Sequence, residues 1–383
     1  MVSRRSFLMG TGAIALGQLL SGCGQSSDLR VLLLQGSIPP QLLHAFGQQL
    51  PSSSLSFKPQ AQLKTLFELL EIWQGKNENN QGVLSHLPKI PLVNPKPPVI
   101  SDLVTLGDAW LAQGIRDQLI QPLLIDDLEN WQTLPSRWQR LVKRDGQGNL
   151  QENGPIWGAP YRWGTTLMAY RQDKLDWKPQ DWSDLWDERL RDRVTIINQP
   201  REVIGLTLKK LGQSYNTADL AQVPGLKSEL FALQKQVKYY SSQHYLQPLL
   251  IGDAWLSVGW SSDILPLLTK NPDIKAVVPL GGTSLWSDVW VQPKNNQSNL
   301  SEIAKQWVNF CWQPQAANLI SLFADGSSPI INQVAQDELS EKVKDNPLLF
   351  VDPTVLDKCE FLEPLPKNAE EDYINLWKDM RNS

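Results

Sequence analysis

Residues 29–73 constrain the fold most, because short apolar runs alternate there with amphipathic stretches. Leu29 to Leu34 is almost wholly apolar, as is typical of a strand buried on both faces. Residues 42–50 carry apolar side chains at helical spacing, and Leu55 to Phe57 predicts a second strand. Residues 62–73 predict a second amphipathic helix. This order of elements indicates an α/β domain.

The same alternation continues along the chain. Residues 75–98 are polar and then rich in proline, which predicts a loop. Further strands are predicted at residues 102–106, 156–170, 194–198, 237–240 and 285–291, and helices after residues 181 and 200, at 301–312 and 315–323, and around 373–377. A chain of 383 residues exceeds the usual size of a single core, so two domains are expected.

The N-terminal segment has the features of an export signal. Arg4 and Arg5 form a twin-arginine pattern, and the apolar run after them is too short to cross a bilayer. Leu20-Ser-Gly-Cys23 has the form of a lipobox. These features predict a signal over residues 1–22, a lipid on Cys23, a tether over residues 23–28, and a periplasmic protein anchored to a membrane. The alternative is a plain secretory signal with an incidental cysteine.

Charge and composition exclude several classes of function. The formal net charge is −4 at pH 7, which disfavours nucleic acid as a partner. The three histidines, His44, His86 and His244, lack metal-ligand spacing, and no nucleophile elbow or phosphate loop is present. We therefore expect no metal, no cofactor, no catalytic residue and no enzymatic activity. Cys311 and Cys359 either pair or remain two free buried thiols, and the sequence leaves both alternatives open.

The stretch from Pro279 to Pro293 carries the most specific chemistry. Two glycines precede a predicted strand on which Trp286 and Asp288 are separated by one residue. An aromatic face beside a carboxylate suits an organic cation, because the ring attracts positive charge and the carboxylate pairs with an ammonium group. In the alternative interpretation Trp286 is a core residue and Asp288 lies at a strand edge or in a turn.

Six motifs occur in an order that resembles one protein family. They are Ile156-Trp-Gly-Ala-Pro160, Asp181-Trp-Ser-Asp-Leu-Trp186, Arg201-Glu-Val with Leu208-Lys-Lys-Leu-Gly212, Gly259-Trp260, Gly281-Gly282 and Trp286-Ser-Asp288. The chain thereby resembles the bacterial extracellular solute-binding proteins of ABC importers, above all those for spermidine and putrescine. The resemblance implies a two-lobe α/β fold of the type II-like periplasmic binding protein class, with a ligand cleft between lobes joined by hinge strands. It also implies that the protein is a monomer and that it interacts with the permease subunits of an ABC transporter.

The resemblance divides the mature chain into two lobes. Lobe 1 is expected to span residues 29–162, with residues 288–334 returning to it. Lobe 2 is expected to span residues 163–287 and to carry the C-terminal helices of residues 335–383.

In this family a polyamine lies between aromatic rings, and carboxylates cap its ammonium groups. The resemblance places Trp260 and Trp286 at the ring walls, and Glu202 and Asp288 at two of the capping acids. The chain departs from the family pattern elsewhere. Uncharged Gln199 stands where an aspartate is usual, and Ser37 and Ser327 stand where larger aromatic or acidic side chains are usual. Asp108 is the candidate to replace the missing charge.

These observations predict a substrate-binding lipoprotein of an ABC importer that captures a polyamine or a similar organic cation by lobe closure. A protein that binds another small solute is one alternative. A scaffold or sensor that kept the fold without transport is another. We expect Asp288→Asn to weaken cation binding far more than it lowers stability, provided that the carboxylate serves the ligand.

Overall fold

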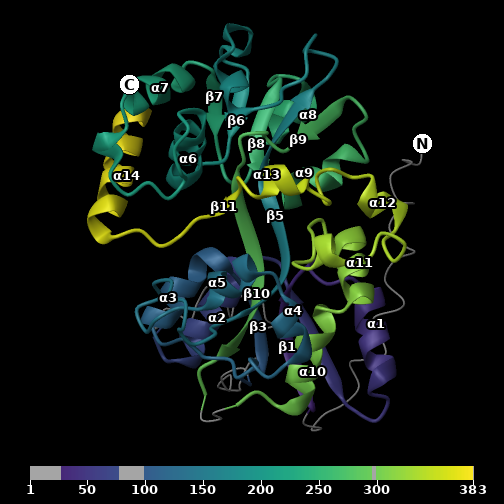
Figure 1. The fold of residues 1–383 in the computed structure, drawn as a ribbon. Helices are drawn as coiled ribbons and strands as arrows, with labels where there is room; N and C mark the ends of the chain where they lie inside the picture. Colours follow the sequence, from purple (N-terminus) through teal and green to yellow (C-terminus); the bar gives the residue numbers. More distant parts are fainter. Residues whose placement is uncertain (1–26, 77–98, 296–298, 383) are drawn as a thin grey trace, which may run out of the picture.

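The computed structural model describes residues 27–76, 99–295 and 299–382, which form two lobes joined by shared strands (Figure 1). Hydrogen-bonded strands follow the order β2-β1-β3-β10-β5-β8-β6-β7 from the outer edge of one lobe to the outer edge of the other. The predicted signal, most of the predicted tether with Cys23, and most of the proline-rich loop lie outside the described residues.

Lobe 1 is built on a parallel sheet in which β1 lies between β2 and β3. Its strands are β1 (Leu29–Leu34), β2 (Leu55–Gln60), β3 (Leu103–Gly107) and β4 (Ile120–Gln121). Its helices are α1 (Pro40–Gln49), α2 (Leu63–Trp73), α3 (Leu111–Arg116), α4 (Glu129–Thr133), α5 (Ser136–Val142), α10 (Glu302–Cys311) and α11 (Pro314–Phe323), with the 3-10 helices η2 (Asp108–Trp110) and η6 (Ile331–Gln333). The short strand-and-helix alternation of the sequence thus forms the predicted α/β layer.

Lobe 2 repeats this plan around a second, smaller group of strands. These are β6 (Val194–Ile196), β7 (Val237–Tyr240), β8 (Leu256–Trp260) and β9 (Ile274–Val277). The helices are α6 (Pro200–Lys210), α7 (Leu226–Gln234), α8 (Gln247–Ile251), α9 (Ser261–Leu268) and α14 (Lys367–Arg381), with η3 (Trp182–Trp186), η4 (Glu188–Leu190) and η5 (Leu220–Gln222). Buried leucines of α6 and α7 and Tyr373 of α14 belong to one apolar core in this lobe.

Two long strands, β5 (Ala159–Arg171) and β10 (Ser284–Pro293), run side by side through both lobes (Figure 1). In lobe 1, β10 pairs with β3, and in lobe 2 the far half of β5 pairs with β8 and β9. A third connection returns the chain to lobe 2 through β11 (Glu360–Phe361), which pairs with the start of β10. Because all three connections lie together, they form the hinge between the lobes.

The C-terminal region differs from the predicted lobe boundary. The helix α12 (Glu341–Lys344) packs against α11, and the Leu356 carbonyl at the end of α13 (Pro353–Leu356) accepts a hydrogen bond from Arg137 of α5. Val343 and Leu348 join the apolar cluster that contains Trp307 of α10. The last helix, α14, packs on lobe 2, against α6 and α7. The helix α12 thus packs on lobe 1, whereas the prediction assigned it to lobe 2.

Two further properties bear on the site. Cys311 and Cys359 are both free and buried, so the two-thiol alternative holds. Within the described ranges, no helix combines the length and the apolar character that a membrane crossing requires, and no group of three or more potential metal ligands occurs.

Candidate functional site

Three cross-strand pairs on one face of the two hinge strands organise the candidate site. Asp288 lies opposite Arg162, and Trp286 lies opposite Gly164. One step further along, the hydroxyl groups of Ser284 and Thr166 lie 2.9 Å apart. Alternate residues of a strand share a face, so these pairs form one continuous strip, which we call the hinge row. It runs from lobe 1 at Asp288 to lobe 2 at Ser284.

Glu202 closes the lobe 2 end of the hinge row. It lies in the first turn of α6, where a carboxylate is favoured by the helix dipole. Its Oε2 atom accepts a hydrogen bond of 2.6 Å from the Ser284 hydroxyl, and its side chain is buried. Burial raises the pKa of Glu202, and hydrogen bonds from Ser284, Thr166 and Trp260 oppose that rise. Among the described residues no cation forms an ion pair with this carboxylate.

The aromatic ring walls stand beside Glu202 and along the row. Trp260 ends β8 directly opposite Thr166, and it is half-buried. Trp286 packs flat against Gly164, where a Cβ atom would overlap both the indole ring and the Ser261 hydroxyl. A residue without a side chain is therefore required opposite the ring. The structure thus brings the two predicted tryptophans and Glu202 onto one face of the hinge.

An arginine of the chain itself occupies the lobe 1 end of the row. The Nε and Nη2 atoms of Arg162 lie 2.8 Å and 2.7 Å from Oδ2 of Asp288, and both side chains are buried. The guanidinium carbon lies 5.2 Å from the centre of the Trp286 ring, and Nη1 donates to the Ala324 carbonyl. The ring and the carboxylate do hold a cation, as their chemistry suggests. That cation is a side chain of the protein.

Asp288 and Glu202 therefore have different electrostatic environments. Burial raises the pKa of Asp288, but the Arg162 guanidinium opposes the rise and balances the charge. The two carboxylates also stand at opposite ends of the hinge row, because Ser284, which donates to Glu202, and Asp288 are four residues, or about 13 Å, apart along β10.

Asp108 lies next to the row, at the end of β3. Its Oδ1 atom accepts a hydrogen bond of 2.9 Å from the backbone nitrogen of Ser287. Burial raises its pKa to about 7, the negative charge of Asp288 adds to the rise, and Arg144 opposes it. The structure thus places Asp108 beside Asp288, and its role in replacing the missing ligand charge stays a prediction.

The other three predicted ligand residues lie apart from the row. Gln199 precedes α6 and is exposed. Ser37 is buried and accepts a hydrogen bond of 2.9 Å from the Tyr161 hydroxyl, while Ser327 donates to the Leu349 carbonyl at 2.6 Å. Both serines are therefore satisfied inside the protein. Their role in ligand binding remains a prediction, although the Ser327 backbone pairs with Trp163, which lies between Arg162 and Gly164 on β5.

Sequence reasoning did not single out Arg162, although one signal was available. Arg162 is a charged residue in the middle of an otherwise uncharged stretch of β5, from Ala159 to Tyr170. A buried charge requires a partner, so its position alone indicates an ion pair. The identity of the partner depends on the register between β5 and β10, which the local sequence does not contain.

Two lobes around a three-segment hinge, with rings and carboxylates where the lobes meet, define the class of two-lobe solute-binding proteins. The family model described as "Bacterial extracellular solute-binding protein" matches residues 100–359. The chain belongs to this family.

Relatives of known function agree with that membership. The chain is 27% identical over 355 residues to the spermidine/putrescine-binding periplasmic protein of Salmonella typhimurium, covering 92% of each chain. It is 26% identical over 246 residues to the putrescine/cadaverine-binding protein of Pseudomonas aeruginosa, covering 60% of this chain and 68% of that one.

Solved structures confirm the predicted fold class. A spermidine/putrescine ABC transporter substrate-binding protein from Streptococcus pneumoniae superposes with a TM-score of 0.75 at 20% identity, over 93% of this chain and 99% of that chain. A binding protein from A. tumefaciens in complex with agropinic acid gives a TM-score of 0.55 at 12% identity, over 92% and 97%. The same fold thus serves proteins whose solutes differ in chemistry.

Proposed function

We propose that this chain is the solute-binding subunit of an ABC importer and that it captures a small organic cation, a polyamine or a compound of similar charge, by lobe closure. Glu202 is the residue that carries the proposal. It is buried, it accepts hydrogen bonds from hydroxyl groups, and its carboxylate lacks an ion-pair partner among the described residues. A ligand ammonium beside the Trp260 ring would compensate that charge.

Arg162 limits how many ammonium groups of such a ligand the hinge row can accept. Because it neutralises Asp288 and covers the Trp286 ring, one of the two predicted cation positions is already filled. A ligand that binds without moving Arg162 has one ammonium group for Glu202 and no second one for Asp288. A polyamine that used both acids would have to displace Arg162 from its buried position.

Titration calorimetry tests this proposal. The mature chain, unfolded and refolded to remove bound solute, is titrated with putrescine and with spermidine. We expect saturable binding that Glu202→Gln abolishes, because the amide keeps the shape and loses the charge. The exposed Glu371 on α14 provides the matched control Glu371→Gln, which should bind as the unaltered chain does.

Two results would count against the proposal. Absence of heat with both amines, at protein concentrations that detect micromolar affinity, would exclude the polyamine assignment. Binding that survives Glu202→Gln would exclude Glu202 as the ammonium acceptor. In the first case the occupied Asp288 position would favour a protein for another small solute, or a scaffold or sensor of the same fold.

Export and anchoring are part of the same proposal. Family relatives are periplasmic proteins by name, and the twin-arginine and lipobox patterns at residues 3–23 support export with a lipid on Cys23. Cys23→Ala should move the protein from the membrane fraction to the soluble fraction of a cell lysate. Retention of the variant in the membrane fraction would contradict the anchor.

A further inference from the structure

A cavity of about 260 Å³ lies at the junction of the two lobes, on the side of β10 away from the hinge row. Leu285 lines it, and side chains alternate along a strand, so Leu285 points away from the Trp286 and Asp288 side. Residues from α5, from the segment around β11, and Asn216 of lobe 2 complete the wall. We call this space the arginine cavity because Arg137, Arg140 and Arg144 line it.

Arg144 is the unusual member of this group. Its side chain is 2% exposed, and it donates to the backbone carbonyls of Leu141 at 2.9 Å and Gly148 at 3.2 Å. Within the described ranges, no carboxylate lies within the 4.0 Å limit of an ion pair with it. Burial lowers its pKa, and the charges of Asp108 and Glu363 oppose this from a greater distance. A buried guanidinium without a direct counter-ion is costly, so an anion at this place would be stabilising.

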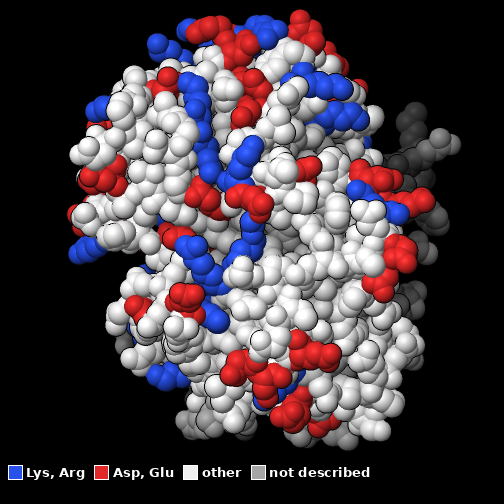
Figure 2. Space-filling model, in the orientation of Figure 1, with Lys and Arg blue, Asp and Glu red and all other residues white. Residues whose placement is uncertain are grey.

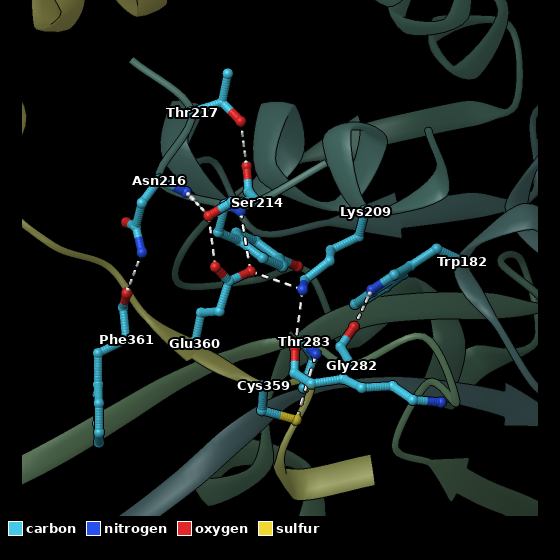
Figure 3. Close-up of polar contacts among 12 residues, drawn as sticks. Trp182, Lys209, Ser214, Asn216, Thr217, Gly282, Thr283, Cys359, Glu360 and Phe361 are labelled. Atoms are coloured by element: carbon cyan, nitrogen blue, oxygen red, sulfur yellow. Dashed lines mark hydrogen bonds and ion pairs between the residues drawn. The ribbon is translucent and has the colours of Figure 1, made fainter. Parts of the chain in front are cut away.

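The acidic residues of the wall are already paired with other cations. Glu363 forms an ion pair of 2.7 Å with Arg140. Glu360 accepts from Lys209 at 2.6 Å, from the Ser214 hydroxyl and from the Tyr215 backbone (Figure 3). Neither carboxylate therefore serves as the counter-ion of Arg144.

Arginine side chains also stand at the rim of the cavity, each beside an acidic partner. Figure 2 shows Lys and Arg side chains gathered along the middle of the molecule, with acidic side chains next to them. Arg137 also donates to the Leu356 carbonyl and to the exposed Asp357, which leaves its guanidinium at the rim. Guanidinium groups bind carboxylate and phosphate oxygens in pairs, so their convergence favours an oxyanion.

We propose that the arginine cavity binds a small oxyanion, either inorganic phosphate or a small carboxylate. A volume of about 260 Å³ is slightly less than that of pockets for drug-sized ligands. The anion contacts Arg144 in the floor and Arg140 at the rim. Because the wall includes lobe 1, the segment around β11 and Asn216, the bound anion joins the two lobes at a point separate from the hinge row.

Thermal unfolding of the mature chain tests the site with two probes, sodium phosphate and sodium malonate. Each is compared with sodium chloride at equal ionic strength and pH, because salts also act by screening. We expect at least one probe to raise the Tm with a saturable dependence on concentration in the millimolar range. A response to phosphate alone or to malonate alone identifies the type of oxyanion, and either supports the site.

Three variants separate binding from general salt effects. Arg144→Gln should abolish the saturable shift, and Arg140→Gln should weaken it several-fold. Arg116 is an exposed arginine on α3, so Arg116→Gln should respond as the unaltered chain does. If Arg144→Gln does not fold, the double variant Arg137→Gln/Arg140→Gln replaces it, because both side chains are partly exposed.

Equal responses in the unaltered chain and in the cavity variants would overturn the proposal. So would Tm shifts for both probes that match sodium chloride or rise linearly without saturation. Such results would leave Arg144 as a cap of α5, whose Leu141 carbonyl it contacts.

Discussion

Asp288→Asn tests the ion pair at the end of the hinge row. The substitution leaves the Arg162 guanidinium buried, with its Nε and Nη2 atoms facing an uncharged amide. Removing one partner of a buried ion pair costs about 3–5 kcal/mol, because the other charge remains without compensation. The Ala324 carbonyl still accepts from Nη1, so we expect the lower half of this range, about 3–4 kcal/mol.

Urea unfolding followed by tryptophan fluorescence measures this cost, since the chain has 16 tryptophans. Arg162→Met and the double variant complete a double-mutant cycle. The double variant should be more stable than the sum of the single effects predicts, because it removes both buried charges together. The exposed pair of Arg191 and Glu188 is the control, and Glu188→Gln should cost less than about 1 kcal/mol.

The pH dependence distinguishes the two single variants. In Arg162→Met the buried Asp288 carboxylate takes up a proton as the pH falls, so the cost of this variant should shrink in acid. The cost of Asp288→Asn should not shrink in this way, because the variant has no carboxylate to take up a proton and the Arg162 guanidinium remains charged throughout. A cost of Asp288→Asn below about 1 kcal/mol, or additive effects in the cycle, would refute the ion pair as described. Such a small cost would agree with the sequence-based expectation that Asp288→Asn weakens cation binding far more than it lowers stability.

Two other substitutions test the surroundings of the row. Burial raises the pKa of Asp108 to about 7, so the folded state binds the proton more tightly and the contribution of this group to stability falls as the pH rises from about 4 to 7. The change in the free energy of unfolding caused by Asp108→Asn should therefore be more favourable at pH 8 than at pH 5. Urea unfolding that gave the same change at both pH values would contradict the raised pKa. Gly164→Ala should displace the Trp286 ring, cost about 1–3 kcal/mol in the same assay and shift the tryptophan emission. Unchanged emission and stability would show that the ring is not held against Gly164.

The strands and the amphipathic helices could be predicted because their signals are local. Apolar runs such as Leu29–Leu34 and Val194–Ile196 became the buried strands β1 and β6. The stripe of apolar residues in residues 301–312 became α10. Each pattern lies within one element, so it could be recognised without knowing which segments that element packs against.

The site could be predicted only in part, because its contacts join distant segments. The resemblance located Glu202, Trp260, Trp286 and Asp288, and the structure places all four on one face of the hinge. The partner of Asp288 depends on the register of two strands that are 126 residues apart, and a slip of one residue would turn Arg162 to the other face.

The hydrogen-bond partners of the serines could not be predicted for the same reason. Ser37 and Ser327 stand at positions that the resemblance assigns to the ligand, but Tyr161 and the Leu349 carbonyl use their hydroxyl groups. The packing of α12 against α11 of lobe 1 was also not predicted, because a single apolar residue such as Val343 predicts burial without indicating the lobe.

The return of the last helix to lobe 2 has a consequence for the order in which the chain is made. The strands of lobe 2 are complete once Val277 has been synthesised, but α14 is added about 90 residues later, after the remaining parts of lobe 1. Until then the surface of α6 and α7 that receives α14 stays uncovered, and the Tyr215 and Thr217 carbonyls wait for the Tyr373 hydroxyl. A chain that ends before Lys367 therefore leaves the surface of α6 and α7 uncovered in lobe 2, far in sequence from the point where the chain ends.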